Sequence, residues 1–106
     1  MGHPREGQTA VIFVSESTGS DPAGYTAAAD QLGELVARQP GFRGVDWIAN
    51  ADGGEITISY WADDASAAAW REHPEHARIQ HEGRGKWLRR YDLMVAEIRR
   101  GHLWER

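Results

Sequence analysis

The sequence predicts a single α+β domain of the ferredoxin-like kind, with the element order β-α-β-β-α-β. The chain has 106 residues, which is the usual length of one domain. Four short segments carry the β-branched and aromatic pattern of strands. The helical segments separate them in the order of the split βαβ motif. This order gives a four-stranded antiparallel sheet that carries its helices on one face.

The first strand and the first helix are expected between residues 9 and 39. Thr9 to Ser17 reads TAVIFVSES and is short and apolar enough for a strand that is buried on both faces. The dipeptide Asp21-Pro22 is typical of a helix start, because Asp caps the first amides and Pro tolerates the first position. Apolar residues follow on one stripe from Tyr25 to Val36. Gln39-Pro40-Gly41 ends the helix.

A β-hairpin is expected next. Phe42 to Ala51 forms its first strand, and Asp52-Gly53-Gly54 is a tight-turn signal. Glu55 to Ala62 forms its second strand. Alternation along these strands predicts three sets of residues that each share a face: Val45, Trp47 and Ala49; Ile56, Ile58 and Tyr60; Thr57, Ser59 and Trp61.

Two short helices and a last strand complete the pattern. Asp63 and Asp64 cap a helix that runs to Trp70, and Pro74 can open a second helix that ends near Gly85. The last strand is expected at residues 90–99. Residues 1–8 and 101–106 are expected to be flexible tails around a domain at residues 9–100.

Both faces of the first and third strands are apolar or aromatic, so the face without helices also needs a cover. A second copy of the sheet is the economical cover, and it predicts a symmetric homodimer.

Composition excludes several classes of function. The net charge is −4, which leaves no basic excess for nucleic acid. The chain has no cysteine, so disulfides, thiolate catalysis and cysteine-ligated metals are excluded. No apolar run approaches the ~20 residues of a membrane span, and we expect a cytoplasmic protein without a membrane partner. The histidine spacing is weak for zinc, and no metal is expected.

Four motifs stand out along the chain. Three are the turn QPGF at residues 39–42, the strand ITISYW at residues 56–61 and the helix segment AAW at residues 68–70. The fourth is the series His76, Gln80, Gly83-Arg84, Trp87 and Tyr91. With these motifs the chain resembles the antibiotic biosynthesis monooxygenase (ABM) family over residues 9–100. The resemblance implies a dimeric α/β barrel with a pocket in each subunit, between the helices and the sheet.

The resemblance also implies an oxidoreductase. The leading expectation is a cofactor-independent monooxygenase that acts on a small apolar aromatic or polyketide-like substrate. No dinucleotide or phosphate-binding motif is present, which agrees with a reaction without a cofactor. Fold alone does not fix the reaction within such a family.

The expected catalytic residues are His76, Trp70 and Arg84. A histidine titrates near neutrality, which suits a base that removes a proton from a phenol or enol. Arg84 would hold an anionic oxygen, with a salt bridge to Glu75 or Glu82 as the alternative. His73 and His81 are expected to be ordinary surface or capping residues.

The expected substrate-binding residues are aromatic, apart from one glutamine. Five tryptophans in so short a chain indicate a well-filled core, an aromatic-lined pocket, or both. The candidates are Trp61, Trp47, Phe13, Gln80 and Trp87.

Two other functions stay open. Haem-degrading relatives pair the helix Trp with an Asn on the first strand and a His further along. Trp70 matches, but the first strand has no Asn, and Gln80 stands where the His would fall, with His81 one place later. Haem binding of another kind remains an alternative. The other alternative is a non-catalytic small-molecule-binding or accessory dimer, whose pocket its own tryptophans fill.

Overall fold

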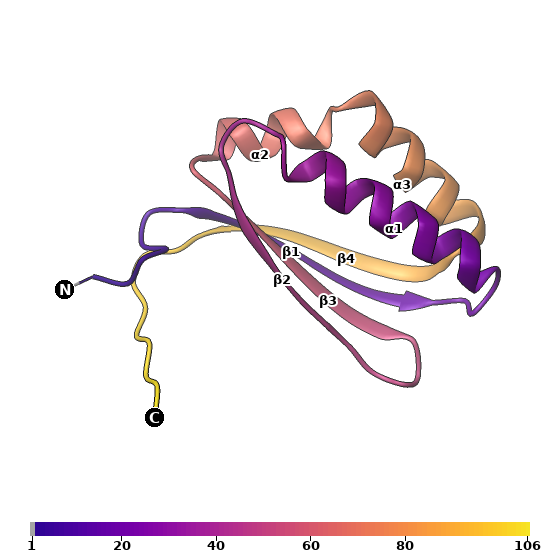
Figure 1. Cartoon of the computed structure of the whole chain (residues 1–106), viewed down its shortest axis with the longest axis horizontal. Helices are drawn as coiled ribbons and strands as arrows, with labels where there is room; N and C mark the ends of the chain where they lie inside the picture. Colours follow the sequence, from indigo (N-terminus) through magenta and orange to yellow (C-terminus); the bar gives the residue numbers. More distant parts are fainter. Residues whose placement is uncertain (1) are drawn as a thin grey trace.

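The computed structural model describes residues 2–106 and confirms the predicted order of elements, with the second helical segment divided in two (Figure 1). The elements are β1 (Thr9–Ser17), α1 (Pro22–Val36), β2 (Phe42–Ala49), β3 (Gly54–Trp61), α2 (Asp64–Arg71), α3 (Pro74–Lys86) and β4 (Leu88–Glu97). The predicted and observed bounds differ by a few residues at the ends of elements, where a helix or strand frays.

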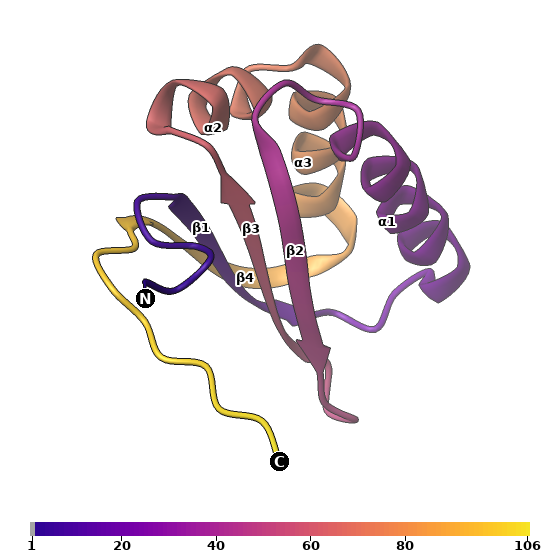
Figure 2. The same ribbon diagram turned by 60° about the vertical axis from the view of Figure 1, so that its left-hand side comes forward.

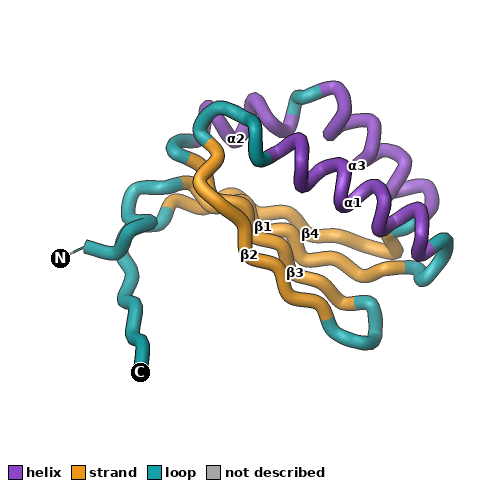
Figure 3. The backbone as a smooth tube through the Cα atoms, in the orientation of Figure 1, coloured by secondary structure: helices purple, strands orange, loops and turns teal. Residues whose placement is uncertain are grey.

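The four strands form one antiparallel sheet in the order β2-β3-β1-β4. All three helices lie on the same face of this sheet, and no helix or strand of residues 2–106 covers the other face (Figure 3). The two layers are those of a ferredoxin-like fold.

The strand register determines which side chains face the helices. Val11 of β1 packs against the helical core and pairs with Ser59 of β3 and Val95 of β4. Because side chains alternate along a strand, every second residue from these points faces the helices. The face-sharing sets predicted for β2 and β3 are consistent with this register.

Local capping explains where the helices begin. The Asp21 carboxylate accepts the Gly24 amide at 3.2 Å, and the Asp63 carboxylate accepts the Ser66 amide at 2.8 Å. His73 caps α3, since its Nδ1 accepts the Glu75 amide at 3.2 Å and Pro74 takes the first helical position. Pro74 therefore starts a new helix and separates it from α2.

The core is concentrated at one end of the sheet. Trp61 is fully buried and clusters with Ala67 and Trp70 of α2. Leu32 and Val36 of α1 are among the partly buried residues that pack against this cluster. Elsewhere α1 packs loosely, because none of its residues is buried.

The two termini lie at the same end of the sheet. The chain beyond Ile98 is extended, and it leaves the body on the side that faces away from the helices (Figures 1 and 2). Among residues 2–106, no helix has the length and apolar character to cross a membrane.

Candidate functional site

Among the aromatic ring pairs of residues 2–106, His76 and Trp70 have the shortest distance between ring centroids. Their ring centroids are 4.4 Å apart and their planes differ by 11°. Trp70 also stacks on Trp61 at 6.4 Å, and His73 lies 5.5 Å from the Trp70 ring. The start of α3 thus brings His76 against the tryptophan that α2 supplies. Three residues predicted for the site are together here.

A hydrogen bond fixes the tautomer of His76. Its Nδ1 lies 3.1 Å from the Trp70 carbonyl oxygen. Because a carbonyl oxygen can only accept, Nδ1 carries the hydrogen, and in the neutral ring Nε2 keeps its lone pair. Among residues 2–106, Nε2 has no hydrogen-bond partner, and no buried side-chain nitrogen or oxygen is left without one. Nε2 therefore reaches an accessible surface.

Burial disfavours the charged form of the His76 ring. Loss of solvent around the imidazole lowers its pKa below the ordinary value of 6.5, and the nearby His73 lowers it further. The hydrogen bond to the Trp70 carbonyl raises the pKa of His76, but its effect is smaller than that of burial. A neutral histidine with one free nitrogen can accept a proton.

A hollow of about 250 Å³ opens on the surface beside Trp70. It lies between the turn that follows α1 and the first part of α2. Its lining consists of Gln39, Pro40, Asp63, Ala65, Ser66, Ala69 and Trp70. His76 is not among these residues. Sequence analysis missed the polar members, Gln39, Asp63 and Ser66, because nothing in their spacing connects them before the chain folds.

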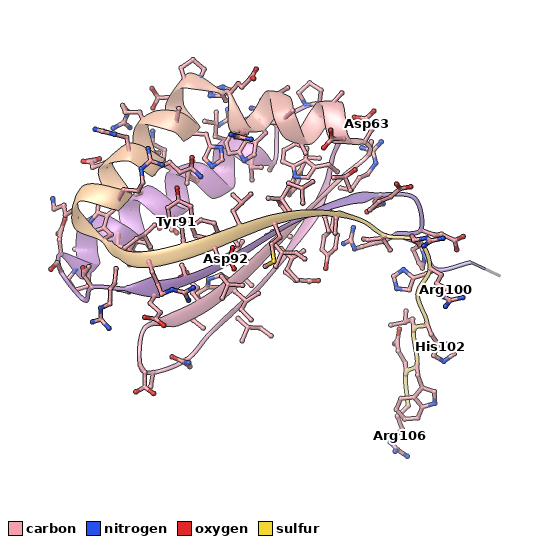
Figure 4. The ribbon with its side chains drawn as sticks, turned by 180° about the vertical axis from the view of Figure 1, so that it is seen from behind. Asp63, Tyr91, Asp92, Arg100, His102 and Arg106 are labelled. Carbon is pink, nitrogen blue, oxygen red and sulfur yellow. The ribbon has the colours of Figure 1, made fainter. Side chains whose placement is uncertain are left out.

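Arg84 lies near the other end of α3, in a second group. It donates to the Tyr91 hydroxyl at 3.0 Å, and Tyr91 stacks on Phe13 at 5.1 Å. Figure 4 labels Tyr91, which rises from β4 toward the helices. The predicted alternative, a salt bridge from Arg84 to Glu75 or Glu82, is wrong.

Those two carboxylates pair with Arg78 instead, at 3.2 and 3.7 Å. Arg78 stands three residues after Glu75 and four before Glu82. These spacings place charged side chains side by side on a helix.

A third group surrounds Glu55 on β3. Its carboxylate accepts the Tyr25 hydroxyl at 2.7 and 2.9 Å and the Trp47 indole nitrogen at 2.9 Å. Burial, and then Glu55, raise the pKa of Tyr25 well above its ordinary value. Trp87 packs edge-on against Tyr25 at 6.1 Å and is buried, while Trp47 is 62% exposed. The group ties α1 to the sheet.

The predicted site residues therefore do not form one cluster. Glu55 and Trp61 lie six residues apart on β3, about 20 Å along a strand. His76, Trp70 and Trp61 are at one end, and Trp47 and Trp87 are at the other. Gln80 is half-buried on α3, and His81 is exposed.

Alternation along β3 places Glu55 on the same face as the buried Trp61. Glu55 alternates along β3 with Thr57, Ser59 and Trp61, so its side chain faces the helices as theirs do. In residues 2–106, no three histidine or carboxylate side chains gather closely enough to hold a metal ion.

The motifs of this chain match a known family over most of its length. The family model for antibiotic biosynthesis monooxygenases matches residues 8–82. The chain is a member of the ABM family. The match includes β1 to most of α3, and so both Trp70 and His76.

Similar proteins support the family and the fold. The uncharacterized protein YqjZ of Bacillus subtilis is 40% identical over 96 residues, which cover 91% of this chain and 83% of YqjZ. The ABM domain also resembles a mutant form of SnoaB, a cofactor-independent oxygenase of Streptomyces nogalater. That comparison gives a TM-score of 0.75 and 17% identity, over 88% of this chain and 94% of the SnoaB chain.

Another similar structure is that of Rv0793 from Mycobacterium tuberculosis. Its structure matches with a TM-score of 0.73 and 16% identity, over 92% of this chain and 97% of that chain. At 16–17% identity, the structures of SnoaB and Rv0793 establish the fold of this chain.

Proposed function

We propose that this ABM protein is a cofactor-independent monooxygenase for a small apolar aromatic or polyketide-like substrate, with His76 as its base. One observation carries the proposal. His76 stacks on Trp70, with Nδ1 bonded to a carbonyl and Nε2 free, and burial lowers its pKa. A base needs a free lone pair and a fixed orientation, and His76 has both.

The proposed substrate pocket lies between the helices and the sheet. Two observations support this location. No residue of α1 is buried, so this helix does not seal the sheet beneath it. Val45, Trp47 and Val95 belong to the helix-facing side, yet they remain 49%, 62% and 52% exposed. Exposed apolar side chains under a helical layer suit a flat apolar ligand.

The proposed reaction conserves atoms and electrons. Nε2 of His76 removes a proton from a phenol or enol, which leaves an electron-rich anion. The carbon of this anion reduces dioxygen and forms a C–O bond, and the proton returns to the distal oxygen to give a hydroperoxide. Loss of water then leaves a carbonyl. One oxygen atom enters the product, the other leaves as water, and the substrate loses two hydrogens.

The remaining predicted residues would bind the substrate. Trp70 and Trp61 would form the apolar wall beside the base. Arg84, which bonds to the Tyr91 hydroxyl, lies eight residues after His76 on α3, about 12 Å along the helix, and would bind an anionic oxygen at the end of the substrate remote from the base. Trp47, Phe13, Gln80 and Trp87 would line the rest of the pocket. SnoaB is a cofactor-independent oxygenase of the same fold, which supports a reaction that needs no haem or flavin.

We also propose that the protein is a homodimer that forms through the helix-free face of the sheet. On this face Ile48, Ile56 and Met94 are 73%, 44% and 43% exposed. Ile12 and Ile58 lie between them and are half-buried. An apolar sheet face of this kind marks a protein interface. A second copy gives each sheet an identical apolar cover.

Oxygen uptake tests the proposed reaction. The metal-free protein is mixed with an anthrone, which has a phenolic tautomer, and the uncatalysed oxidation is subtracted. We expect uptake by the wild type, and a loss of roughly a hundredfold or more in kcat/KM in His76→Gln. His81→Gln is the matched control, because His81 is an exposed histidine of the same helix, and it should keep full activity.

The same assay tests the haem alternative. Haemin is added to a parallel sample, and its Soret band is recorded with the wild type and with His76→Gln. Uptake that requires haemin, with a Soret shift that His76→Gln abolishes, would contradict the cofactor-independent reaction.

A further inference from the structure

The helix α1 is attached to the body of the protein in different ways at its two ends. Toward its C-terminus, Leu32, Leu35 and Val36 pack against the apolar cluster that contains Trp61 and Trp70. Toward its N-terminus the attachments are mainly polar, and no residue of the whole helix is buried. The second half of α1 is therefore held by the core, and its first half, residues 22–30, by a few side-chain contacts.

Two side chains make the polar contacts of the first half. The Tyr25 hydroxyl donates to Glu55 of β3 at 2.7 Å, and the Tyr25 ring packs edge-on against Trp87. The Asp21 carboxylate accepts Lys86 Nζ at 3.0 Å and the Trp87 indole nitrogen at 3.3 Å. Asp21 and Lys86 are both exposed, so water competes for their ion pair and the pair holds weakly. We call these contacts of Asp21 and Tyr25 the latch.

A hollow of about 250 Å³ separates the first half of α1 from α3. The two helices lie side by side over the sheet (Figures 1 and 2). The lining consists of Asp21, Gly24, Ala27, Ala28, Gln31, Arg78, Ile79, Glu82, Lys86 and Trp87. Ile79 and Trp87 are buried beneath it, at 5% exposure each. Ile79 stands three residues after His76, on the same face of α3, so the hollow reaches the helix face that carries the proposed base.

The backbone is strained where α1 begins. Asp21 has φ of 47° and ψ of 61°, in the left-handed region that is unfavourable for a residue with a Cβ. The latch holds Asp21 in this conformation. Gly19, at φ of +78°, lies two residues earlier and gives the loop conformational freedom. Release of the latch would let Asp21 return to an ordinary conformation.

We propose that the first half of α1 is a lid that admits the substrate to the pocket between the helices and the sheet. The lid swings outward when the latch opens. Its hinge lies just before Leu32, where the helix enters the core, and Gly33 weakens the helix at this point. Enzyme lids are drawn from segments of low local stability, and the first half of α1 is such a segment. The inference rests on the proposed pocket and not on the reaction with oxygen.

Hydrogen exchange tests the lid in the full chain. Tyr25→Phe removes the bond to Glu55, and Tyr60→Phe is the matched control, because it removes a similar bond to Asp46 on the helix-free face. We expect amide exchange in residues 22–30 to rise roughly fivefold or more in Tyr25→Phe alone, without a comparable rise in residues 32–36. An equal rise in both halves of α1 would overturn the hinge. Equal exchange in the two variants would overturn the latch.

Binding kinetics test entry through the lid. The probe is 9-fluorenone, a flat apolar ketone that does not react with oxygen, and quenching of tryptophan fluorescence reports its binding. We expect its association rate constant to rise roughly fivefold or more in Tyr25→Phe and to stay at the wild-type value in Tyr60→Phe. Equal rate constants in both variants would overturn the lid and leave the pocket. A wild type that 9-fluorenone does not quench, up to its solubility limit, would overturn both.

A cross-link tests the closed state, because the chain has no cysteine of its own. The variant Asp21→Cys/Lys86→Cys places two thiols where the native side chains meet, and a short bismaleimide joins them. The linked protein should bind 9-fluorenone at least tenfold more slowly than the same variant capped with N-ethylmaleimide. Equal rates in the linked and capped proteins would overturn entry through the lid.

Discussion

The imidazole of His76 lies almost parallel to the indole of Trp70, with 4.4 Å between ring centroids, and bonds through Nδ1 to the Trp70 carbonyl. One residue therefore fixes both the plane and the tautomer of the other. The pair occupies the junction where Pro74 separates α3 from α2. Because this packing buries the imidazole of His76, the stability of the protein should depend on pH.

The first prediction concerns stability against pH. The pKa of His76 is about 6.5 in an unfolded chain and lower in the folded protein, because burial disfavours the charged ring. As pH falls below 6.5, the unfolded chain binds the proton first, so the free energy of unfolding decreases. At higher pH the contribution of His76 is constant.

Urea unfolding between about pH 5 and pH 7.5 measures this dependence. His76→Gln should lose less stability than the wild type over this range. An identical slope in the two proteins would show that His76 titrates normally.

The second prediction concerns the packing of Trp70, which is 9% exposed and belongs to the core with Trp61. Trp70→Ala should lower the free energy of unfolding by about 3–5 kcal/mol, as truncation of a large core ring does. Trp70→Phe keeps an aromatic ring and should cost less than half as much. If Trp70→Ala changes the urea midpoint by less than the Phe variant, the ring does not support the core.

The third prediction separates the binding role of Arg84 from a structural one. Its bond to Tyr91 is exposed, so Arg84→Gln should change the free energy of unfolding by less than about 0.5 kcal/mol. If Arg84 stabilises an anionic oxygen, the same variant should lower kcat/KM about tenfold or more.

Tyr91→Phe is the comparison for Arg84→Gln, because it frees Arg84 without removing its charge. It should lose less activity than Arg84→Gln. Equal losses in the two variants would assign the effect to the hydrogen bond between them.

The fourth prediction concerns the tie between α1 and β3. The Tyr25 hydroxyl donates to Glu55, and the bond to a charged acceptor contributes about 1.5–3 kcal/mol. Tyr25→Phe should lower stability toward the lower end of this range, because the pair is only half-buried. A double-mutant cycle with Glu55→Gln should give a coupling energy of about 1 kcal/mol. A coupling energy near zero would show that the two side chains act independently.

The fifth prediction uses two glycines with opposite roles. Gly41 has φ of +83°, and a Cβ there would collide with Ser66. Gly41→Ala should therefore destabilise the protein, by at least ~1 kcal/mol for the backbone alone. Gly33 lies within α1, where a Cβ would meet open space. Gly33→Ala should stabilise the protein by about 0.5–1 kcal/mol. Thermal melts of both variants check the two signs.

The fold was predictable because its signals are local. Asp21, Asp63 and Pro74 mark helix starts through bonds within a few residues of each, and alternation along β3 places its side chains without knowledge of the partner strands. The division of the second helical segment was predictable for the same reason, because its cause is local to Pro74.

The site was less predictable, because it depends on which residues the folded chain brings together. Trp70 and Trp87 look alike in the sequence, yet Trp70 contacts His76 while Trp87 packs against Tyr25 at the far end of the sheet. The partner of Arg84 was also missed. Tyr91 lies in the next strand, whereas Glu75 and Glu82 belong to the same helix as Arg84.

The most direct test is a single-turnover reaction of the metal-free protein with an anthrone under ¹⁸O₂, read by mass spectrometry of the quinone. With wild type and His81→Gln, we predict one ¹⁸O atom in each quinone at a rate far above the uncatalysed oxidation. With His76→Gln, the rate should fall to the uncatalysed level. Incorporation at the wild-type rate in His76→Gln would contradict the role of His76. A wild-type rate no faster than the uncatalysed reaction would contradict the oxygenase itself.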